Sequence, residues 1–365
     1  MSFEKVGFIG LGLIGGSIAK TIKKKYPDTT LIATARHADT IQEAHNFGTI
    51  ENDTLLPLSD FADCDYIFLC TPVQQNLIYL KELKSVIKPS CIITDVGSVK
   101  SDIHKAVTAM DMEANFIGGH PMCGSEKTGF FNATEYLLEN AYYIITPTAK
   151  TTPAQLEEFH ALVKSLGSVP MILDYEKHDF ATAAISHLPH IIASSLVNLV
   201  SDLDDEQETM RTIAAGGFKD ITRIASSSPV MWQNICLSNQ KQILKLTDCY
   251  IHALQNIRSF VADAKSDDII SFFQSAKDYR DSITTPVRGS LQKNYSVYCD
   301  LVDEAGAIAT LATIMASHNI SIKNIGILHN REYEDGVLQI EFYEEDALEK
   351  AVKLMEDNHY VVHRR

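Results

Sequence analysis

The chain has 365 residues, of which 45% are hydrophobic, and its formal net charge is −15. A chain of this length and apolar content can bury more than one hydrophobic core, so several soluble globular domains are expected. The acidic balance argues against nucleic acids and anionic membranes as partners and favours small-molecule ligands.

The seven cysteines are scattered along the chain and form no Cys-x-x-Cys pair. This usage is typical of a reducing compartment and predicts no structural zinc site. We find no signal peptide and no continuous run of about 18 apolar residues, so no membrane span is expected. The sequence therefore predicts a cytoplasmic protein without a metal centre.

The chain begins with a short buried strand, three spaced glycines and a helix. Gly10, Gly12 and Gly15 fit the G-x-G-x-x-G pattern of dinucleotide-binding units. In that pattern the first glycine permits a tight turn, the second lets a pyrophosphate approach the backbone, and the third lets the helix pack on its strand. The start of the helix, at Leu13 and Ile14, would offer N–H groups to the phosphates.

A second strand over residues 30–35 ends where an acidic residue usually binds the ribose of NAD. That acid is missing here, because Ala35 stands at the strand end and is followed by Arg36. A small residue beside a cation would tolerate the 2′-phosphate of NADP; in the alternative interpretation, Arg36 stacks on adenine or faces solvent. NAD is the expected cofactor, with NADP as the alternative.

Two further strands deliver polar residues to the same edge of the sheet. The strand over 66–70 ends in Thr71 and a proline, a sharp exit that makes Thr71 a candidate cofactor contact. The strand over 91–94 leads into Asp-Val-Gly-Ser-Val-Lys, in which Ser98 either caps the next helix or serves a ligand.

The strand over 115–118 is followed by the most glycine-rich polar stretch of the chain, which contains His120. A histidine in such a loop is poorly placed for core packing and well placed to face a ligand. Strands over 141–146 and 169–173, with a helix over 153–166, complete the expected doubly wound α/β sheet.

From residue 174 helical patterns replace the β signals, which marks a domain boundary. We expect a dinucleotide-binding domain over 1–173 and an all-helical domain over 174–282. Apolar spacing over 235–261 predicts one long, largely buried helix of the kind that forms a dimer seam. After a linker over 281–294, the order β-α-β-β-α-β over 295–365 predicts a ferredoxin-like α+β domain.

The helical domain carries two polar motifs. In Ser-His-Leu-Pro-His, which contains His187 and His190, Pro189 should kink or end the helix. One of these histidines is expected to face a ligand. Lys219 and Arg223 lie one helical turn apart, which suits either an anionic ligand or a solvated pair of cations.

Taken together, the motifs resemble those of bacterial prephenate dehydrogenases that bear a C-terminal ACT domain. The resemblance spans essentially the full length. It rests on the glycine pattern, on Trp232 and on four segments, namely DVGSVK at 95–100, GGHPMCGSE at 118–126, SHLPH at 186–190 and GFKDITRIA at 217–225. Two positions depart from the family pattern, since Ala35 replaces the usual acid and Lys219 stands where arginine is frequent.

The resemblance implies an NAD(P)-dependent enzyme that decarboxylates prephenate oxidatively to 4-hydroxyphenylpyruvate and CO2, and the long helix predicts that it is a homodimer. His120 would accept a hydrogen bond from the substrate hydroxyl, and Ser98 would bridge that hydroxyl and the nicotinamide. Among the substrate-binding residues it implies, Arg223 would clamp a carboxylate, His187 would line the pocket, Glu126 would orient or gate it, and Trp232 would either wall it or belong to the core.

The resemblance also implies that the ACT domain senses L-tyrosine; in the alternative, that domain only dimerises. Arogenate, the amino counterpart of prephenate, is an alternative substrate. A β-hydroxyacid-type dehydrogenase fits less well, because no matching catalytic-lysine segment is found. A non-catalytic sensor also fits less well, since it would not need His120, Ser98 and Arg223 together.

Overall fold

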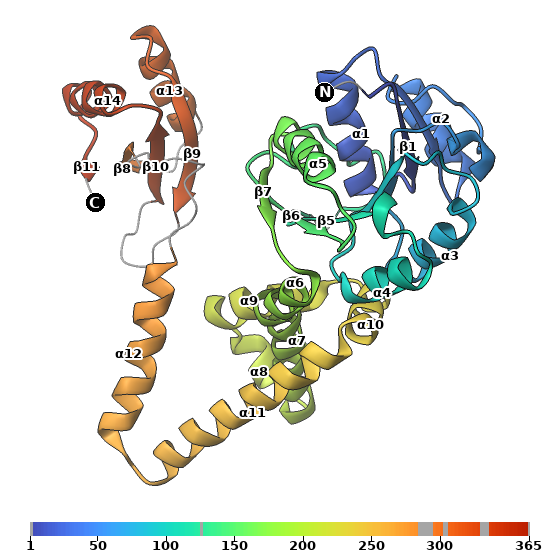
Figure 1. Cartoon of the computed structure of the whole chain (residues 1–365). Coiled ribbons are helices and arrows are strands. Elements are labelled where there is room, and N and C mark those ends of the chain that lie inside the picture. The colour runs from blue at the N-terminus through green and yellow to red at the C-terminus, as the bar shows by residue number, and fades with distance from the viewer. Residues whose placement is uncertain (1–2, 125–126, 284–294, 302–305, 329–335, 364–365) are drawn as a thin grey trace. The chain divides into compact units, whose positions relative to one another are not determined.

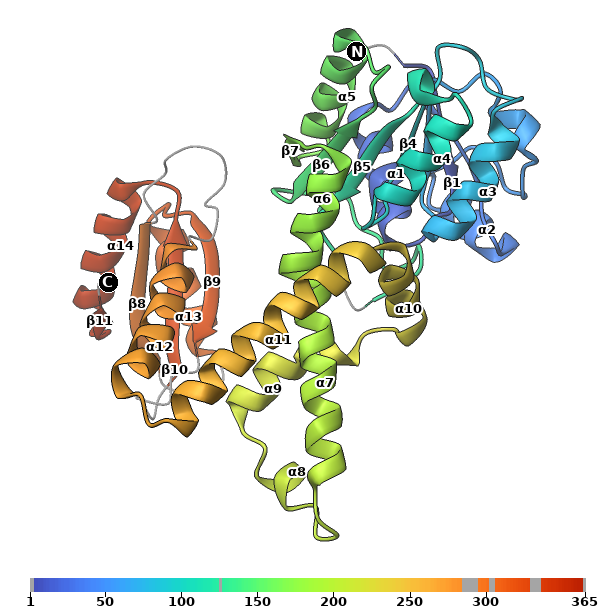
Figure 2. The ribbon, with the colours of Figure 1, turned by 60° about the horizontal axis from the view of Figure 1, so that its bottom comes forward.

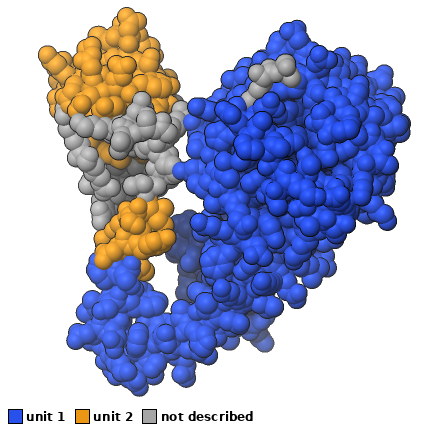
Figure 3. Space-filling model, viewed as in Figure 1, with its two compact units in different colours: residues 1–275 blue, residues 276–365 orange. Residues whose placement is uncertain are grey.

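The computed structural model describes residues 3–124, 127–283, 295–301, 306–328 and 336–363. The chain divides into two compact units, Met1–Ser275 and Ala276–Arg365, which are coloured separately in Figure 3. The first unit contains two sheets and two hydrophobic cores, and the second has a sheet and a core of its own.

The N-terminal half of the first unit is built on a parallel sheet with the strand order β2-β1-β3-β4. Beside it lies a three-stranded sheet, β5-β6-β7, joined through a parallel bridge between Ile93 and Phe116. The strands are β1 (Lys5–Ile9), β2 (Thr30–Thr34), β3 (Tyr66–Leu69), β4 (Ile92–Asp95), β5 (Ile117–Pro121), β6 (Tyr142–Pro147) and β7 (Val169–Ile172). The expected Rossmann-type fold is confirmed.

Two strands of this half, β6 and β7, run against the others. β6 pairs antiparallel with β5, and β7 then pairs parallel with β6. A parallel pair needs a crossover, usually a helix, and no helix is found between β5 and β6 in the described part of that connection. The sheet is therefore mixed at this edge.

Helices cover both faces of the sheet (Figure 1). They are α1 (Leu13–Lys25), α2 (Ala38–Asn46), α3 (Val73–Leu83), α4 (Ser101–Ala109) and α5 (Pro153–Ser165), with short 3-10 turns at Leu58–Phe61 and Glu113–Asn115. Because side chains alternate along a strand, Phe8 joins a core with α1, α2 and α5, whereas Ile9 joins a second core with α3 and α4.

The rest of the first unit is helical, as expected. Its helices are α6 (Tyr175–Thr182), α7 (Leu188–Leu203), α8 (Thr209–Ile213), α9 (Gly216–Thr222), α10 (Pro229–Ser238), α11 (Gln240–Ala262) and α12 (Ser266–Ser282), the last of which continues into the second unit, and a 3-10 turn at Arg223–Ser226 follows α9.

Pro189 does not end its helix. The turn before it, Ala183–His187, widens into a π-helix, and α6 and α7 form one continuous rod (Figure 2). A proline has no N–H group and its ring crowds the preceding turn, so a wider turn lets the helix continue past it. The sequence motif therefore marks a local distortion within one long helix.

That rod, Tyr175–Leu203, is long and apolar enough to span a membrane by length and composition alone. It also contains the buried pair His178 and Asp179, whose hydrogen bonds tie it to the Rossmann half. Charged groups of this kind are costly inside a bilayer. In this structure the rod is part of the globular first unit.

The long helix predicted over 235–261 is two helices, since α10 ends and α11 begins at Asn239. The expectation that it is largely buried is wrong for the single chain, where Ile243 is the one buried residue of α11. Large apolar side chains stay exposed over the helical part, among them Leu199, Leu203, Ile213, Ile221, Leu237, Leu244, Ile251, Leu254 and Val261.

The second unit confirms the predicted ferredoxin-like order. It consists of β8 (Tyr295–Leu301), α13 (Ala307–Ser317), β9 (Ile322–Leu328), β10 (Gly336–Phe342), α14 (Glu345–Asp357) and β11 (Val362–His363). The antiparallel sheet has the order β11-β8-β10-β9, and its core includes Val297, Leu311 and Ile340. The predicted linker over 281–294 starts within α12, and residues 284–294 lie outside the described residues.

Candidate active site

The glycine turn between β1 and α1 has the geometry that a pyrophosphate site needs. Gly10 has a left-handed φ of +95°, and a Cβ on Gly15 would lie 2.5 Å from the Gly10 carbonyl oxygen. A Cβ on Gly12 would meet no described atom within 4 Å. Two glycines are thus required by the fold, while the middle one leaves room for a ligand.

The first turn of α1 complements that room. The helix begins after Gly12 with no side-chain cap and no acidic residue, and its first residues are Leu13 and Ile14. The free N–H groups and the helix dipole favour an anion there. The residues present therefore fit the phosphates of a dinucleotide.

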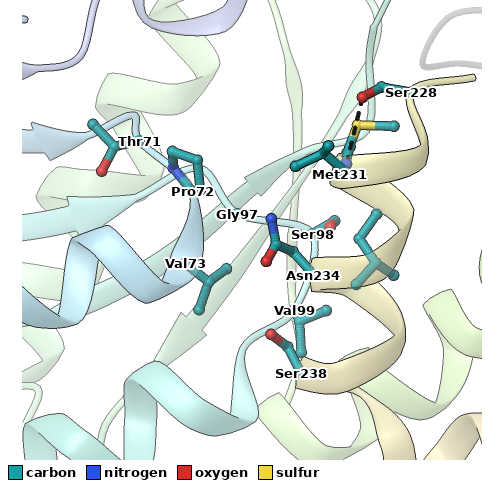
Figure 4. A pocket seen from close by; sticks show the side chains of 12 residues that line it. Thr71, Pro72, Val73, Gly97, Ser98, Val99, Ser228, Met231, Asn234 and Ser238 are labelled. Carbon is teal, nitrogen blue, oxygen red and sulfur yellow. Dashed lines mark hydrogen bonds between the residues drawn. The ribbon is translucent and has the colours of Figure 1, made fainter. Parts of the chain in front are cut away.

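A cavity of about 350 Å³ lies beyond the carboxyl ends of β3 and β4 (Figure 4). The strand ends contribute Thr71 and Ser98, so two of the predicted site residues share this cavity. The opposite wall is formed by α10 of the helical part. Crevices at strand carboxyl ends are where open α/β sheets bind their ligands.

Ser98 does not cap the helix that follows it. α4 starts at Ser101, and its cap comes from the other half of the unit. The carboxylate of Asp179, on α6, accepts hydrogen bonds from the Lys100 and Ser101 amides at 2.7 Å each. The Ser98 hydroxyl is thereby left for the cavity.

The loop that carries Ser98 is held from below by a fully buried ion pair. Asp95, at the end of β4, binds the Lys100 ammonium group and accepts the Gly97 amide at 2.9 Å. Its second oxygen accepts the Gly119 amide at 3.3 Å, next to His120. One carboxylate thus fixes the serine loop against β5.

His120 lies within β5 and pairs with Ile144, so its predicted position in a loop beyond the strand is wrong. The strand extends to Pro121 because the backbone of 119–121 continues the antiparallel ladder with β6. A strand holds the ring more rigidly than a loop would. The side chain remains half-buried at the edge of the sheet.

A chain of hydrogen bonds runs from His120 to Asp179. His120 Nδ1 lies 2.8 Å from His178 Nε2, and His178 Nδ1 lies 2.8 Å from Asp179 Oδ1. A carboxylate only accepts, so His178 must donate from Nδ1. With His178 neutral, its Nε2 accepts from His120 Nδ1, which leaves His120 Nε2 with a free lone pair.

The surroundings keep His120 neutral. Burial lowers the pKa of His120 well below its usual 6.5, and the nearby His178 and Lys100 lower that pKa further. For Asp179, burial alone would raise the pKa, but hydrogen bonds from His178 and from the α4 amides hold that pKa below its usual range. The arrangement is an oriented, uncharged base beside a permanent anion.

His187 lies beside this chain rather than at the surface. It is buried, and its Nδ1 is 3.2 Å from the Nδ2 of Asn239, which also donates to the Asp179 carbonyl. Burial lowers the pKa of His187 to about 4. The Trp232 ring is 6.0 Å from His187 and stacks on His190 at 3.9 Å.

Three of the remaining predicted residues are exposed, and one lies outside the described residues. Arg223 and Lys219 are exposed on the helical part, and Arg36 is exposed after β2. Glu126 lies outside the described residues. Among those that the structure describes, no three His, Cys, Asp or Glu side chains are arranged to hold a metal ion.

The sequence interpretation missed four residues of this arrangement. Asp95 and Lys100 stood within a quoted motif without a role, and His178 and Asp179 were not singled out. The available signal was a charged His-Asp pair on a helix that begins the second domain.

Comparison with known proteins identifies the family. Residues 18–172 match the model for the prephenate dehydrogenase nucleotide-binding domain, and residues 174–275 match that for the prephenate dehydrogenase dimerization domain. The prephenate dehydrogenase of Bacillus subtilis (strain 168) is 38% identical over 349 residues, which cover 95% of this chain and 94% of that protein. The chain belongs to the prephenate dehydrogenase family.

Two solved structures resemble the first unit. The prephenate dehydrogenase of Aquifex aeolicus, in complex with hydroxyphenyl propionate and NAD+, has a TM-score of 0.73 at 28% identity and covers 78% of this chain and 99% of its own. The arogenate dehydrogenase of Synechocystis has a TM-score of 0.70 at 30% identity, covering 77% and 100%. The fold, the family and the oxidoreductase class expected from the motifs are confirmed.

The glycine turn yields a matched pair of variants. Gly12→Ala should leave the unfolding midpoint near that of wild type, because its Cβ meets no described atom, yet weaken dinucleotide binding by about tenfold or more. Gly15→Ala should lower the midpoint, since overpacking against backbone costs about 1–3 kcal/mol. Thermal unfolding and cofactor titration check both. Unchanged cofactor affinity in Gly12→Ala would contradict the placement of the phosphates.

Proposed function

We propose that the protein is an NAD-dependent prephenate dehydrogenase that converts prephenate to 4-hydroxyphenylpyruvate and CO2. The observation that carries the proposal is the chain His120–His178–Asp179, which orients one free ring nitrogen at the sheet edge. NAD as cofactor is supported by the nucleotide-binding family match and by the NAD+ in the Aquifex relative. NADP remains the alternative, because the exposed cation Arg36 could accommodate its 2′-phosphate.

In this proposal His120 Nε2 accepts the hydrogen bond of the substrate hydroxyl and then its proton. As it does so, the Nδ1 proton moves to His178, whose positive charge is stabilised by Asp179. The cofactor supplies the acceptor for the hydride that leaves the ring carbon bearing the hydroxyl. Ser98, which lines the cavity, would contact the hydroxyl and the nicotinamide.

The proton that His120 accepts returns to the product. When the ring carboxylate leaves as CO2, the electron pair of the broken C–C bond completes the aromatic ring and places negative charge on the ring oxygen. That oxygen takes the proton back from His120, so hydride and CO2 are the net losses. A base with a low pKa suits this step because it returns the proton readily.

We assign substrate binding to Arg223, His187, Trp232 and Glu126. A guanidinium binds a carboxylate in a bidentate manner, which suits the dianionic prephenate. Asn239 connects His187 to Asp179, because its amide group lies within hydrogen-bond distance of the His187 ring and of the Asp179 carbonyl. The Trp232 ring in turn packs against His187. Glu126 is retained on the family motif alone.

We further propose that the enzyme is a homodimer and is cytoplasmic. The exposed apolar side chains of α7, α10 and α11 lie within residues 174–275, which match a dimerization domain, so a second copy would cover them. All seven cysteines are free thiols, which fits a reducing compartment.

The function is tested by following reduced cofactor with prephenate or arogenate as substrate and NAD or NADP as acceptor. Turnover of prephenate with NAD is expected. Ala35→Asp should increase the preference for NAD, because a carboxylate repels the 2′-phosphate. Turnover of arogenate alone would replace prephenate as substrate, and no turnover of either would refute the proposal.

The histidine pair predicts a distinctive pH dependence. His120→Asn should lower kcat by roughly 10² or more while cofactor affinity is kept. In wild type, activity should fall at acid pH as His120 takes up a proton, with a midpoint below 6.5. His178→Asn should move that midpoint upward, because repulsion from a protonated His178 lowers the pKa of His120.

His160→Asn, on α5 away from the site, serves as the control and should behave as wild type. An acid midpoint unchanged in His178→Asn would show that His178 does not act on His120. Near-normal turnover in His120→Asn would remove the histidine from the mechanism.

We propose that the second unit is an ACT domain that binds L-tyrosine and inhibits the enzyme. Its β-α-β-β-α-β order supports this, and Gly306, at φ +94°, starts α13 with N–H groups open to an amino acid carboxylate. The neighbouring residues 303–305 lie outside the described residues. In the alternative, this unit only dimerises.

Removing the residues after Lys293 should leave activity but abolish tyrosine inhibition. The Aquifex relative is covered over 99% of its length although it matches only 78% of this chain. A related enzyme thus folds at the shorter length, which supports folding of the truncated protein. Gly306→Val should weaken inhibition more gently. By linkage, prephenate should weaken tyrosine binding by the same factor. Full tyrosine sensitivity of the truncated enzyme would instead locate inhibition at the active site.

A further inference from the structure

α10 presents to the cavity a stripe that contains two polar side chains, Asn234 and Ser238. Met231, Asn234 and Ser238 recur at helical spacing along one face and line the cavity together with the capping residue Ser228. Figure 4 shows Asn234 and Ser238 pointing from α10 toward the loop that carries Ser98. Nothing in the mechanism above uses this stripe.

Two of these side chains lack protein partners. Ser238 is 8% exposed, and its hydroxyl oxygen is buried without a hydrogen bond. Asn234 is half-buried, and its side chain makes no hydrogen bond within the described parts of the chain. A buried hydroxyl without a partner costs free energy, so its retention at a cavity wall points to a ligand.

The position in the sheet indicates which ligand. The glycine turn follows β1, and the strand order is β2-β1-β3-β4. A methyl group of Thr71 is 2.8 Å from where a Cβ of Gly10 would lie, so the cavity adjoins the turn on the β3 side. A dinucleotide centred on the turn extends its adenosine toward β2 and its nicotinamide toward β3 and β4.

We propose that Asn234 and Ser238 bind the carboxamide of the nicotinamide ring. A carboxamide offers one acceptor and two N–H donors, and both an asparagine amide and a serine hydroxyl donate and accept. The apolar wall formed by Val73, Val99 and Ile235 suits the faces of a flat ring. This inference rests on the proposed function only for the nicotinamide cofactor.

The absence of charged residues from the cavity lining favours the nicotinamide over the substrate as its ligand. None of the residues that line it is charged. A carboxylate of prephenate would call for a cation such as arginine, whereas neutral amide and hydroxyl groups suit a neutral carboxamide. The helical half therefore takes part in selecting the redox end of the cofactor.

The test compares two ligands that differ only in the nicotinamide. Calorimetric titration of the full-length protein with NAD and with ADP-ribose should show NAD binding weakened on the order of tenfold in Asn234→Ala and more in Asn234→Ala/Ser238→Ala. ADP-ribose affinity should stay within about twofold. Gln233→Ala, one residue away and outside the cavity lining, should match wild type for both ligands.

Equal weakening of both ligands would overturn the proposal in favour of a structural role, and so would unchanged NAD affinity. A rise in the prephenate KM with NAD binding intact would assign the stripe to the substrate instead. Should Asn234→Ala fail to fold, Asn234→Leu keeps the branched shape of the side chain and loses the hydrogen bonds. If wild type oxidises neither prephenate nor arogenate, the proposed function fails, while the comparison of NAD with ADP-ribose still decides this inference.

Discussion

The carboxylate of Asp179 joins the two halves of the first unit in the arrangement that the active site needs. It comes from the helical half, yet it caps α4 of the Rossmann half and orients His178 toward His120. Hydrogen bonds to a charged group are each worth about 1.5–3 kcal/mol, and this residue makes three. This carboxylate thus caps α4, joins the two halves and orients the histidine pair. A substitution of Asp179 would therefore disturb all three at once.

A second buried anion does the corresponding work within the sheet. Asp95 ties the Ser98 loop to β5 through the Gly97 and Gly119 amides and is neutralised by Lys100. An ion pair of this kind pays for its burial only when the remaining polar groups are satisfied, and the two amides satisfy them. The Ser98 loop and the strand that carries His120 are consequently held relative to each other by one buried carboxylate.

Much of the architecture was predictable because it is encoded locally. The glycine turn, the buried strands and the β-α-β-β-α-β order all follow from periodicity and backbone needs, and the structure has them. The reversal of β6 and β7 and the extension of β5 through His120 depend on strand pairing, which single-strand patterns do not contain. His178 and His120 are 58 residues apart in sequence, and Asp179 reaches an amide 79 residues away. Such contacts arise only when two domains pack, so the sequence marked His120 and left its partners unnoticed.

Because α10 forms one wall of the cavity, a ligand bound there contacts both halves of the first unit. Any molecule that binds there touches strand ends of one half and a helix of the other, so its binding energy adds to the cohesion between them. By mass action, the folded and joined state then gains stability as the free concentration of that molecule rises above its Kd. With the nicotinamide cofactor as that molecule, the resistance of the first unit to unfolding would rise with the concentration of free cofactor.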